Sequence, residues 1–167
     1  MIVREMSDQE CRDLLARVEF GRLATVRQNQ PYIVPIYFAY EREHLYGFTT
    51  LGQKVEWMRA NPLVCVEVDD VMSHFHWSSV VVLGRYEELP DTPTYRDLRL
   101  RAQIRLEKRV LWWQTAYAAS SVRSVSHSVN ALFYRISIDE ITGRRVTPDP
   151  VESAVGLSSA ARPAREE

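Results

Sequence analysis

The chain has 167 residues, of which 46% are hydrophobic and 26% are charged, and this composition is typical of a single soluble globular domain. Because the formal net charge is −1, neither nucleic acid nor an anionic membrane is expected as a partner. The charged N-terminus, the absence of an apolar run of about 18 residues and the presence of only two cysteines predict a cytoplasmic protein without a disulfide framework.

Short turns connect most of the predicted elements, which are mainly strands. The sequence SDQE at residues 7–10 is a capping box, and it predicts a helix that ends near residue 18. Two further helices are predicted at 53–61, where Pro62 ends the helix, and at 92–119. Apolar and polar alternation, together with β-branched and aromatic content, predicts six strands, at 20–27, 31–40, 44–50, 63–70, 77–89 and 131–146.

The number of strands and the short links between them predict the fold class. A doubly wound sheet needs a helix between each pair of strands, and several links here are too short for one. The expected fold is therefore mainly β, a six-stranded antiparallel barrel with flanking helices that covers residues 1–146. Residues 147–167 contain three prolines, small residues and charges, so they are expected to form a flexible C-terminal tail.

The sequence FTTLGQK, residues 48–54, joins the third predicted strand to a short helix. Thr49 and Thr50 supply hydroxyls there, Lys54 supplies a cation, and the first amides of a helix have no intrahelical partner. A bound phosphate needs a fixed cation together with hydroxyl and amide donors, so this corner is a candidate phosphate site. An ordinary capped helix start is the alternative interpretation.

Two other features extend this candidate site. Ser78 and Ser79 form a second hydroxyl pair, directly after Trp77 at the start of the fifth strand. The second strand contains Pro35, which cannot donate a ladder hydrogen bond and is expected at an edge, at a bulge or where the backbone faces something other than a strand. A phosphate at one end and a flat ring along this strand together describe a site for flavin mononucleotide (FMN).

Other chemistries have little support in the sequence. His74 and His76 lie two residues apart, but two imidazoles do not make a zinc site, so no metal is expected. A hydrolase elbow, a Cys–His signature and a dinucleotide-binding glycine fingerprint are all absent. The basic stretch 96–109 has apolar residues at helical spacing, which indicates an amphipathic helix with a solvated face. Trp112 and Trp113 cannot both enter one small core, so one is expected to pack elsewhere, such as on a partner subunit.

The order of these segments resembles the pyridoxamine 5'-phosphate oxidase-like superfamily of FMN-binding split β-barrels, most closely its nitroimidazole-resistance (Nim) proteins. The resemblance covers residues 7 to about 146, and its segments are GRLATV, QPYIVPIYFAY, LYGFTTLGQKVEWMRANPLVCVEVD, WSSVVVLGRYEEL and FYRISIDEITGR. It implies a homodimer with FMN at the subunit interface. It also implies that the ring contacts the second strand and the phosphate contacts the corner and the fifth strand. The implied FMN-binding residues are Val34, Pro35, Ile36, Tyr37, Phe48, Thr49, Thr50, Lys54, Trp77, Ser78 and Ser79.

Departures from the family pattern limit the expected activity. True pyridoxamine phosphate oxidases have an arginine at the position of Val34, a lysine at that of Ala39 and a C-terminal Arg-x-His motif that is absent here. Nim proteins have a histidine beside the flavin where this chain has Phe48. The expected function is therefore electron transfer through FMN to a small-molecule acceptor, without pyridoxamine phosphate oxidation and with no catalytic residue assigned.

Two alternatives remain open at this point. The first is a non-enzymatic module of the same fold that holds FMN, haem or a deazaflavin, because the fold does not establish turnover. Haem would need an axial ligand such as His74, His76 or His127. The second is a DNA-linked regulator, which the near-neutral net charge disfavours.

Overall fold

The computed structural model describes residues 1–107 and 132–148, so Trp112, Trp113 and His127 lie outside the described residues. Seven strands, three α-helices and one 3-10 helix lie in the described part. In chain order they are β1 (Ile2–Glu5), α1 (Asp8–Arg17), β2 (Phe20–Arg27), β3 (Gln30–Glu41), β4 (His44–Thr49), α2 (Gln53–Ala60), β5 (Leu63–Ser73), β6 (His76–Leu89), the 3-10 helix η1 (Pro93–Tyr95), α3 (Arg96–Glu107) and β7 (Leu132–Thr147).

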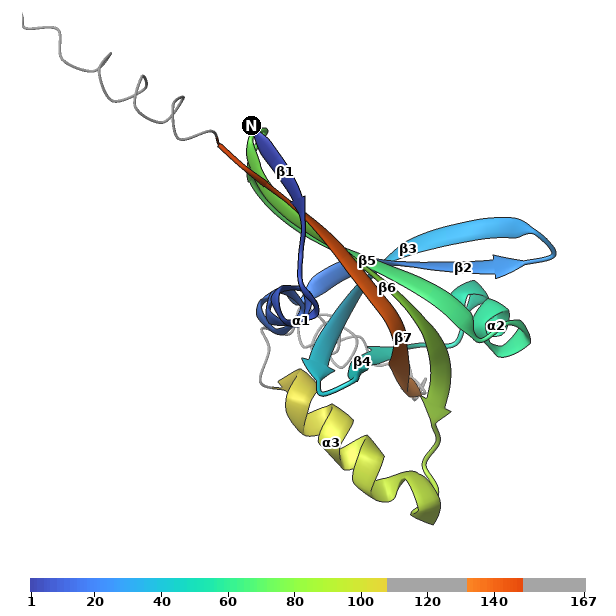
Figure 1. The fold of residues 1–167 in the computed structure, drawn as a ribbon. Coiled ribbons are helices and arrows are strands. Elements are labelled where there is room, and N and C mark those ends of the chain that lie inside the picture. Colours follow the sequence, from blue (N-terminus) through green and yellow to red (C-terminus); the bar gives the residue numbers. More distant parts are fainter. Residues whose placement is uncertain (108–131, 149–167) are drawn as a thin grey trace, which may run out of the picture.

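The strands form one antiparallel sheet that closes on itself (Figure 1). Its order is β1-β7-β4-β3-β2-β5-β6, and β6 also pairs with β7, so that six strands complete a barrel. The predicted antiparallel barrel and its six strands are thereby confirmed. The seventh strand, β1, was not predicted, and it pairs with the end of β7 from Ile2 opposite Thr147 to Glu5 opposite Arg144. Because Thr147 belongs to β7, the strand runs one residue past the predicted domain boundary.

One large hydrophobic core fills the barrel, and two helices contribute to it. Ser7 caps α1 with the predicted capping box, in which its backbone N–H donates to Glu10 at 2.9 Å. Full burial of an aliphatic side chain stabilises a fold by about 1.5–3 kcal/mol, so the buried face of each helix holds it against the sheet. The buried side chains of these helices are Cys11, Leu14 and Leu15 of α1 and Val55 and Met58 of α2.

The helix predicted at 92–119 begins as the 3-10 turn η1, and α3 follows from Arg96. The described part of α3 buries Ala102 against Tyr46 and Leu89, which form a second, smaller core on the outer face of the sheet. Arg99 lies over the ring of Phe133 at 4.8 Å from its centroid, so a cation–π contact also ties α3 to β7. None of the described helices is both long and apolar enough to cross a membrane.

The strand β3 changes neighbours along its length, and this change positions the candidate site. Residues 30–37 of β3 pair with β2, whereas Phe38 to Glu41 pair with β4, beginning with Phe38 opposite Gly47. Among the described strands, residues 30–37 therefore have a partner on one edge only. Figure 1 shows the β2–β3 hairpin extending away from β4, with α2 beside it.

Candidate functional site

The unpaired edge of β3 contains the predicted ring-binding segment. The amide of Phe38 donates to the carbonyl of Glu19 at 2.9 Å, which fixes the side of β3 on which that amide lies. Amides alternate between the two edges of an antiparallel strand, so the nitrogen of Pro35 points to the opposite, unpaired edge. Pro35 lies opposite Arg22 in the β2–β3 ladder without removing a hydrogen bond from it. Pro35 therefore lies at a strand edge, as expected. This edge is on one side of β3 only, because β2 is paired with the other side.

Side chains of the same segment alternate between the core and the surface. Ile36 is buried and Val34 is half-buried, whereas Pro35 and Tyr37 are exposed. Tyr37 packs edge-on against Phe20, with ring centroids 5.0 Å apart. Because these side chains point to the two faces of the sheet, the open edge presents only the backbone of residues 34–37 to a flat ligand.

The corner, residues 48–54, begins where β4 separates from β3. β4 continues beside β7, with Thr49 opposite Leu132, and the chain then turns into α2. The N-cap of α2 is Gly52, and no side chain caps its first turn. The hydroxyl of Thr49 instead donates to the carbonyl of Thr50 at 3.3 Å. Among the described residues, the first amides of α2 therefore have no side-chain acceptor, and an ordinary helix start with glycine as its N-cap remains the alternative interpretation.

Lys54 lies in the first turn of α2, and its side chain is half-buried. Within the described residues its ammonium forms no ion pair or hydrogen bond, and burial lowers the pKa of this group. Arg59, one turn later, differs because its guanidinium binds Glu88. Only two of the 21 basic residues of the chain are lysines. A half-buried cation without a partner, beside uncapped amides, makes the corner suitable for an anion.

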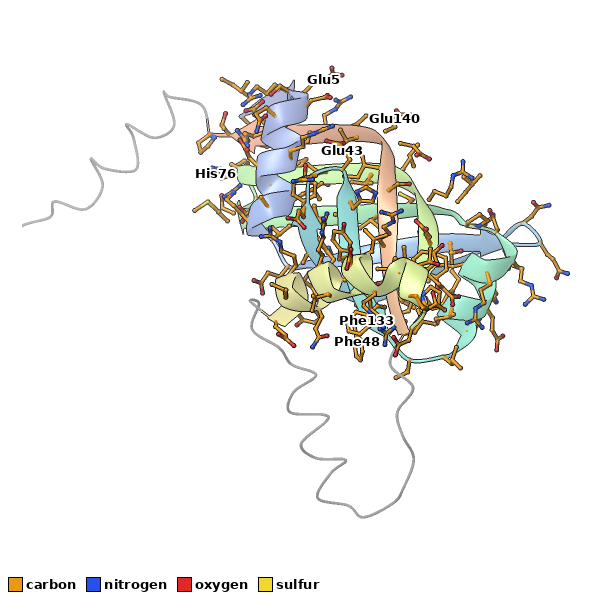
Figure 2. All side chains as sticks on the ribbon, turned by 90° about the horizontal axis from the view of Figure 1, so that it is seen from below. Glu5, Glu43, Phe48, His76, Phe133 and Glu140 are labelled. Carbon is orange, nitrogen blue, oxygen red and sulfur yellow. The ribbon has the colours of Figure 1, made fainter. Side chains whose placement is uncertain are left out.

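Phe48 contributes backbone rather than a side chain to the corner. Its ring packs against Phe133 on the outer face of the sheet, with centroids 5.2 Å apart (Figure 2). Phe133 in turn lies beneath Arg99 of α3. The aromatic side chain at this position therefore belongs to the contact between β4, β7 and α3.

The β6 start, residues 77–79, has hydroxyls that are already engaged. Ser78 is buried, and its Oγ accepts a hydrogen bond from Nε of Arg145 at 3.0 Å. Arg145 also donates to Glu10 at 2.8 Å, which links this serine to the capping box of α1. The hydroxyl of Ser79 donates to Glu67 at 2.9 Å, and Trp77 is half-buried.

Within one chain, the β6 start lies far from the corner. Leu132 of β7 is opposite Thr49, and Arg144 of β7 is opposite Ser79. These two positions are twelve residues apart along β7, which corresponds to roughly 40 Å of strand length at the usual rise per residue. Figure 2 also shows Phe48, at the corner, well apart from His76, next to the β6 start. The structure thus brings the β3 segment and the corner together and leaves the third predicted group apart.

Two of the three histidines named as possible haem ligands lie at the same remote end, and the third, His127, lies outside the described residues. His74 and His76 are exposed at the turn between β5 and β6. No cluster of three or more potential metal ligands occurs in residues 1–107 and 132–148. Sequence reasoning also missed two residues beside the corner, Tyr32 and Trp57, whose rings are in contact across β3 and α2. The only signal for Trp57 was its spacing of three residues from Lys54 on one helix face.

Comparison with known proteins identifies the family. The family model described as pyridoxamine 5'-phosphate oxidase matches residues 7–145. The chain belongs to this family. An uncharacterized protein of Rhizobium meliloti is 41% identical over 144 residues, which cover 86% of this chain and 95% of that protein.

Two solved structures show how far the similarity extends. A FAD-binding protein from Mesorhizobium loti is 40% identical, with a TM-score of 0.70 over 88% of this chain and 100% of that one. A candidate 5-nitroimidazole antibiotic resistance protein from Bacteroides thetaiotaomicron is 18% identical, with a TM-score of 0.62 over 87% of this chain and 89% of that one. The second similarity shows a shared fold, which agrees with the resemblance to Nim proteins noted in the sequence.

Proposed function

We propose that this protein is a flavoprotein that binds a flavin phosphate at the corner and the flavin ring along the open edge of β3. Electrons then pass through the flavin to a small-molecule acceptor. When bound, the flavin supplies the redox chemistry, and the protein contributes binding, orientation and electrostatics. No described side chain at the corner is an evident general acid, so the proposal names no catalytic residue.

The observation that carries the proposal is the unpartnered cation at an uncapped helix start. Among the described residues, the half-buried ammonium of Lys54 has no carboxylate partner, although a buried charge normally has one. A phosphate would supply that partner and would accept hydrogen bonds from the first amides of α2. Thr49 and Thr50 add hydroxyls on the approach to the helix. The residues of the corner therefore fit the phosphate end of a flavin.

FMN and FAD are both candidates for the cofactor. The sequence motifs and the family resemblance predict FMN, with its phosphate at the corner and its flat ring along the β3 edge. The Mesorhizobium relative is a FAD-binding protein, and its 40% identity favours FAD as the second candidate. Both molecules contain the same flavin and first phosphate, so the proposed contacts of Lys54 and β3 apply to either.

We also propose a homodimer with the flavin near the subunit interface. The outer face of β3, β2, β5 and β6 leaves apolar side chains uncovered, and a groove of about 390 Å³ lies on it. Contiguous exposed apolar surface of this kind usually marks an interaction site. A second copy would also allow a β6 start to approach the corner of its partner, which one chain does not permit. Exposed apolar side chains of this face include Ile33 at 63%, Leu63 at 54%, Leu83 at 45% and Val26 at 37%.

The visible spectrum of the purified protein, followed by mass identification of the molecule that heat releases, tests the cofactor. We expect flavin bands near ~370 and ~450 nm, as for flavins in general, and one flavin per chain. Protein that stays colourless after incubation with excess FMN and excess FAD would refute the proposal. A single intense band near ~410 nm would favour haem, although His74 and His76 lie on the exposed turn remote from the corner.

Light scattering tests the assembly. A homodimer should have twice the 19.4 kDa mass of the chain at micromolar concentration. A stable interface of this kind buries on the order of 2,000 Å² in total. Replacing Leu83, which lines the groove on the uncovered face, with glutamate should shift the protein to monomers. A monomeric parent protein would contradict the homodimer but leave the flavin proposal standing.

A further inference from the structure

An aromatic pair joins α2 to β3 beside the corner. The rings of Tyr32 and Trp57 have centroids 5.2 Å apart at an interplanar angle of 53°, and both side chains are half-buried. Neither belongs to the two core clusters of the described residues. Within the same residues, neither the Tyr32 hydroxyl nor the Trp57 indole N–H forms a hydrogen bond, and neither is a fully buried polar atom, so both groups are open to solvent or to a ligand.

The pair lies directly next to the candidate phosphate site. Trp57 follows Lys54 by three residues, so the two side chains are neighbours on one face of α2. Side chains of a helix lean toward its N-terminus, which brings the indole over the turn that contains Lys54. Tyr32 precedes Val34 by two residues and shares its face of β3. The pair therefore continues the proposed flavin site along β3, on the side away from Tyr37.

Other contacts hold α2 in place without these rings. Val55 and Met58 are fully buried in the core. At the end of the helix, the side-chain amide of Asn61 donates to the carbonyl of Val26 at 3.2 Å and accepts from the amide of Leu63 at 3.2 Å. Because these contacts fix α2 at its buried face and at its C-terminus, the position of the helix does not depend on the two half-buried rings.

We propose that Tyr32 and Trp57 form a stacking platform for the adenine of a flavin dinucleotide, so that the site binds FAD more tightly than FMN. The inference rests on the proposed function, because it requires the flavin phosphate at the corner. FMN ends at that phosphate, whereas FAD continues through a second phosphate and a ribose to a flat base. An aromatic surface adjoining the phosphate site matches this extra planar group. The two rings are tilted relative to each other, but a base needs only one aromatic face to stack on, so the tilt does not prevent binding.

The experiment titrates FMN and FAD into the full-length protein after its flavin has been removed, and it follows flavin fluorescence or heat. Stacking of a base on an aromatic side chain changes affinity by roughly 5- to 140-fold, so FAD should bind more tightly than FMN by a factor in this range. Trp57→Leu should remove this advantage and leave FMN affinity within about twofold. Trp57→Phe is the matched control, and it should retain most of the preference for FAD.

Two results would overturn the inference alone. One is equal affinity of the parent protein for FMN and FAD. The other is an equal loss of both affinities in Trp57→Leu, which would mean that the pair only packs α2 against β3. If Trp57→Leu does not fold, Tyr32→Leu provides the same comparison from the other side of the platform. A parent protein that binds neither FMN nor FAD would instead overturn the proposed function itself, and the two failures are therefore distinguishable.

Discussion

The corner and the β6 start contain similar groups but differ in what those groups contact. Each has a pair of adjacent hydroxyls, Thr49 with Thr50 and Ser78 with Ser79, and both pairs are implied to bind a phosphate. At the β6 start, however, each hydroxyl is bonded to a charged side chain of the protein. At the corner, no side chain caps the helix, and Lys54 has no partner among the described residues. A binding site is thus recognised by donors that the fold leaves unengaged.

The difference arises from the strands on which the two groups lie. The β6 start is paired on both sides, with β5 and with β7, so charged residues of these strands surround it. The corner instead follows β4 after the point where β4 and β3 separate. The pair formed by Phe38 of β3 and Gly47 of β4 is the last one before this separation. Where neighbouring strands separate, the backbone and the side chains that follow lose protein partners. The split in the sheet therefore provides the open position for a ligand.

The largest expected effect tests this split. A Cβ at Gly47 would lie 2.2 Å from Cζ and 2.4 Å from the hydroxyl of Tyr134, whose side chain is buried in the core. Gly47→Ala should therefore lower the free energy of unfolding by about 3 kcal/mol, as overpacking of a core does. Urea denaturation measures this change.

The matched control for this prediction is Gly52→Ala. A Cβ at Gly52 has nothing within 4 Å, so the cost should stay below about 1 kcal/mol and reflect only the poorer N-cap. Similar stabilities of the two variants would show that β4 and Tyr134 do not pack as the structure has them.

The next effect concerns the unpartnered cation. Lys54→Ala removes a charge-assisted contact to phosphate that is worth about 1.5–3 kcal/mol, so the affinity for FMN should fall roughly 10- to 100-fold. Riboflavin has no phosphate, and its affinity should change little. Titration of the flavin-free protein with both ligands measures the difference. Equal FMN affinity in variant and parent, or an equal loss for riboflavin, would place the phosphate elsewhere.

The same lysine has a pH effect of defined sign. Because burial lowers the pKa of Lys54 in the folded protein, the unfolded chain binds this proton more tightly than the folded chain. In the flavin-free protein, the free energy of unfolding should therefore rise as the pH approaches the ordinary lysine value of 10.5. Lys54→Ala should show a smaller rise over the same interval when thermal unfolding is followed. A steeper rise in the variant would contradict the burial of an unpaired ammonium.

Most of the fold could be predicted from local patterns, because alternation and turn residues act over a few positions. All six barrel strands and the capping box at Ser7 follow from such patterns. β1 could not be predicted in this way, since its four residues are all exposed and show no alternation. Its partners, Arg144 to Thr147, lie about 140 positions along the chain. The strand exists because β7 extends beyond the barrel and offers it an edge.

The candidate site could be predicted only in part, for a similar reason. The donors of the corner are close in sequence, so their type and spacing were visible. The partners of Ser78 and Ser79 are Arg145 and Glu67, which come from other strands, and their engagement depends on the register of the sheet. The contact between Tyr32 and Trp57 likewise joins residues that only the packing of α2 brings together.

Ser78→Ala tests the β6 start, where the hydroxyls already have protein partners, and its expected effect on stability is smaller. The serine accepts a hydrogen bond from Arg145 in a buried position, so its loss should cost about 1 kcal/mol of stability. FMN affinity should stay within about twofold, because the hydroxyl is already used. A clear loss of FMN affinity without a loss of stability would mean that the hydroxyl leaves Arg145 to contact the phosphate. In that case a second copy must bring the β6 start to the corner.

The smallest effect is expected for Gly52→Ser, which turns the open helix start into a capped one. The backbone of Gly52 is extended, so serine fits without strain, and its Oγ can accept from the amides of Lys54 or Val55. The flavin-free protein should gain a few tenths of a kcal/mol, which is the difference between serine and glycine at an N-cap. A phosphate at the corner uses the same amides, so the new hydroxyl competes with it and FMN affinity should fall about twofold. Urea midpoints measured with and without saturating FMN show both effects, because the stabilisation should appear in the flavin-free protein and shrink in the loaded one. An equal gain in both states would mean that the phosphate does not use these amides, and the donors of the corner that have no protein partner among the described residues would then be reduced to Lys54 and the hydroxyl of Thr50, because the Thr49 hydroxyl donates to the carbonyl of Thr50.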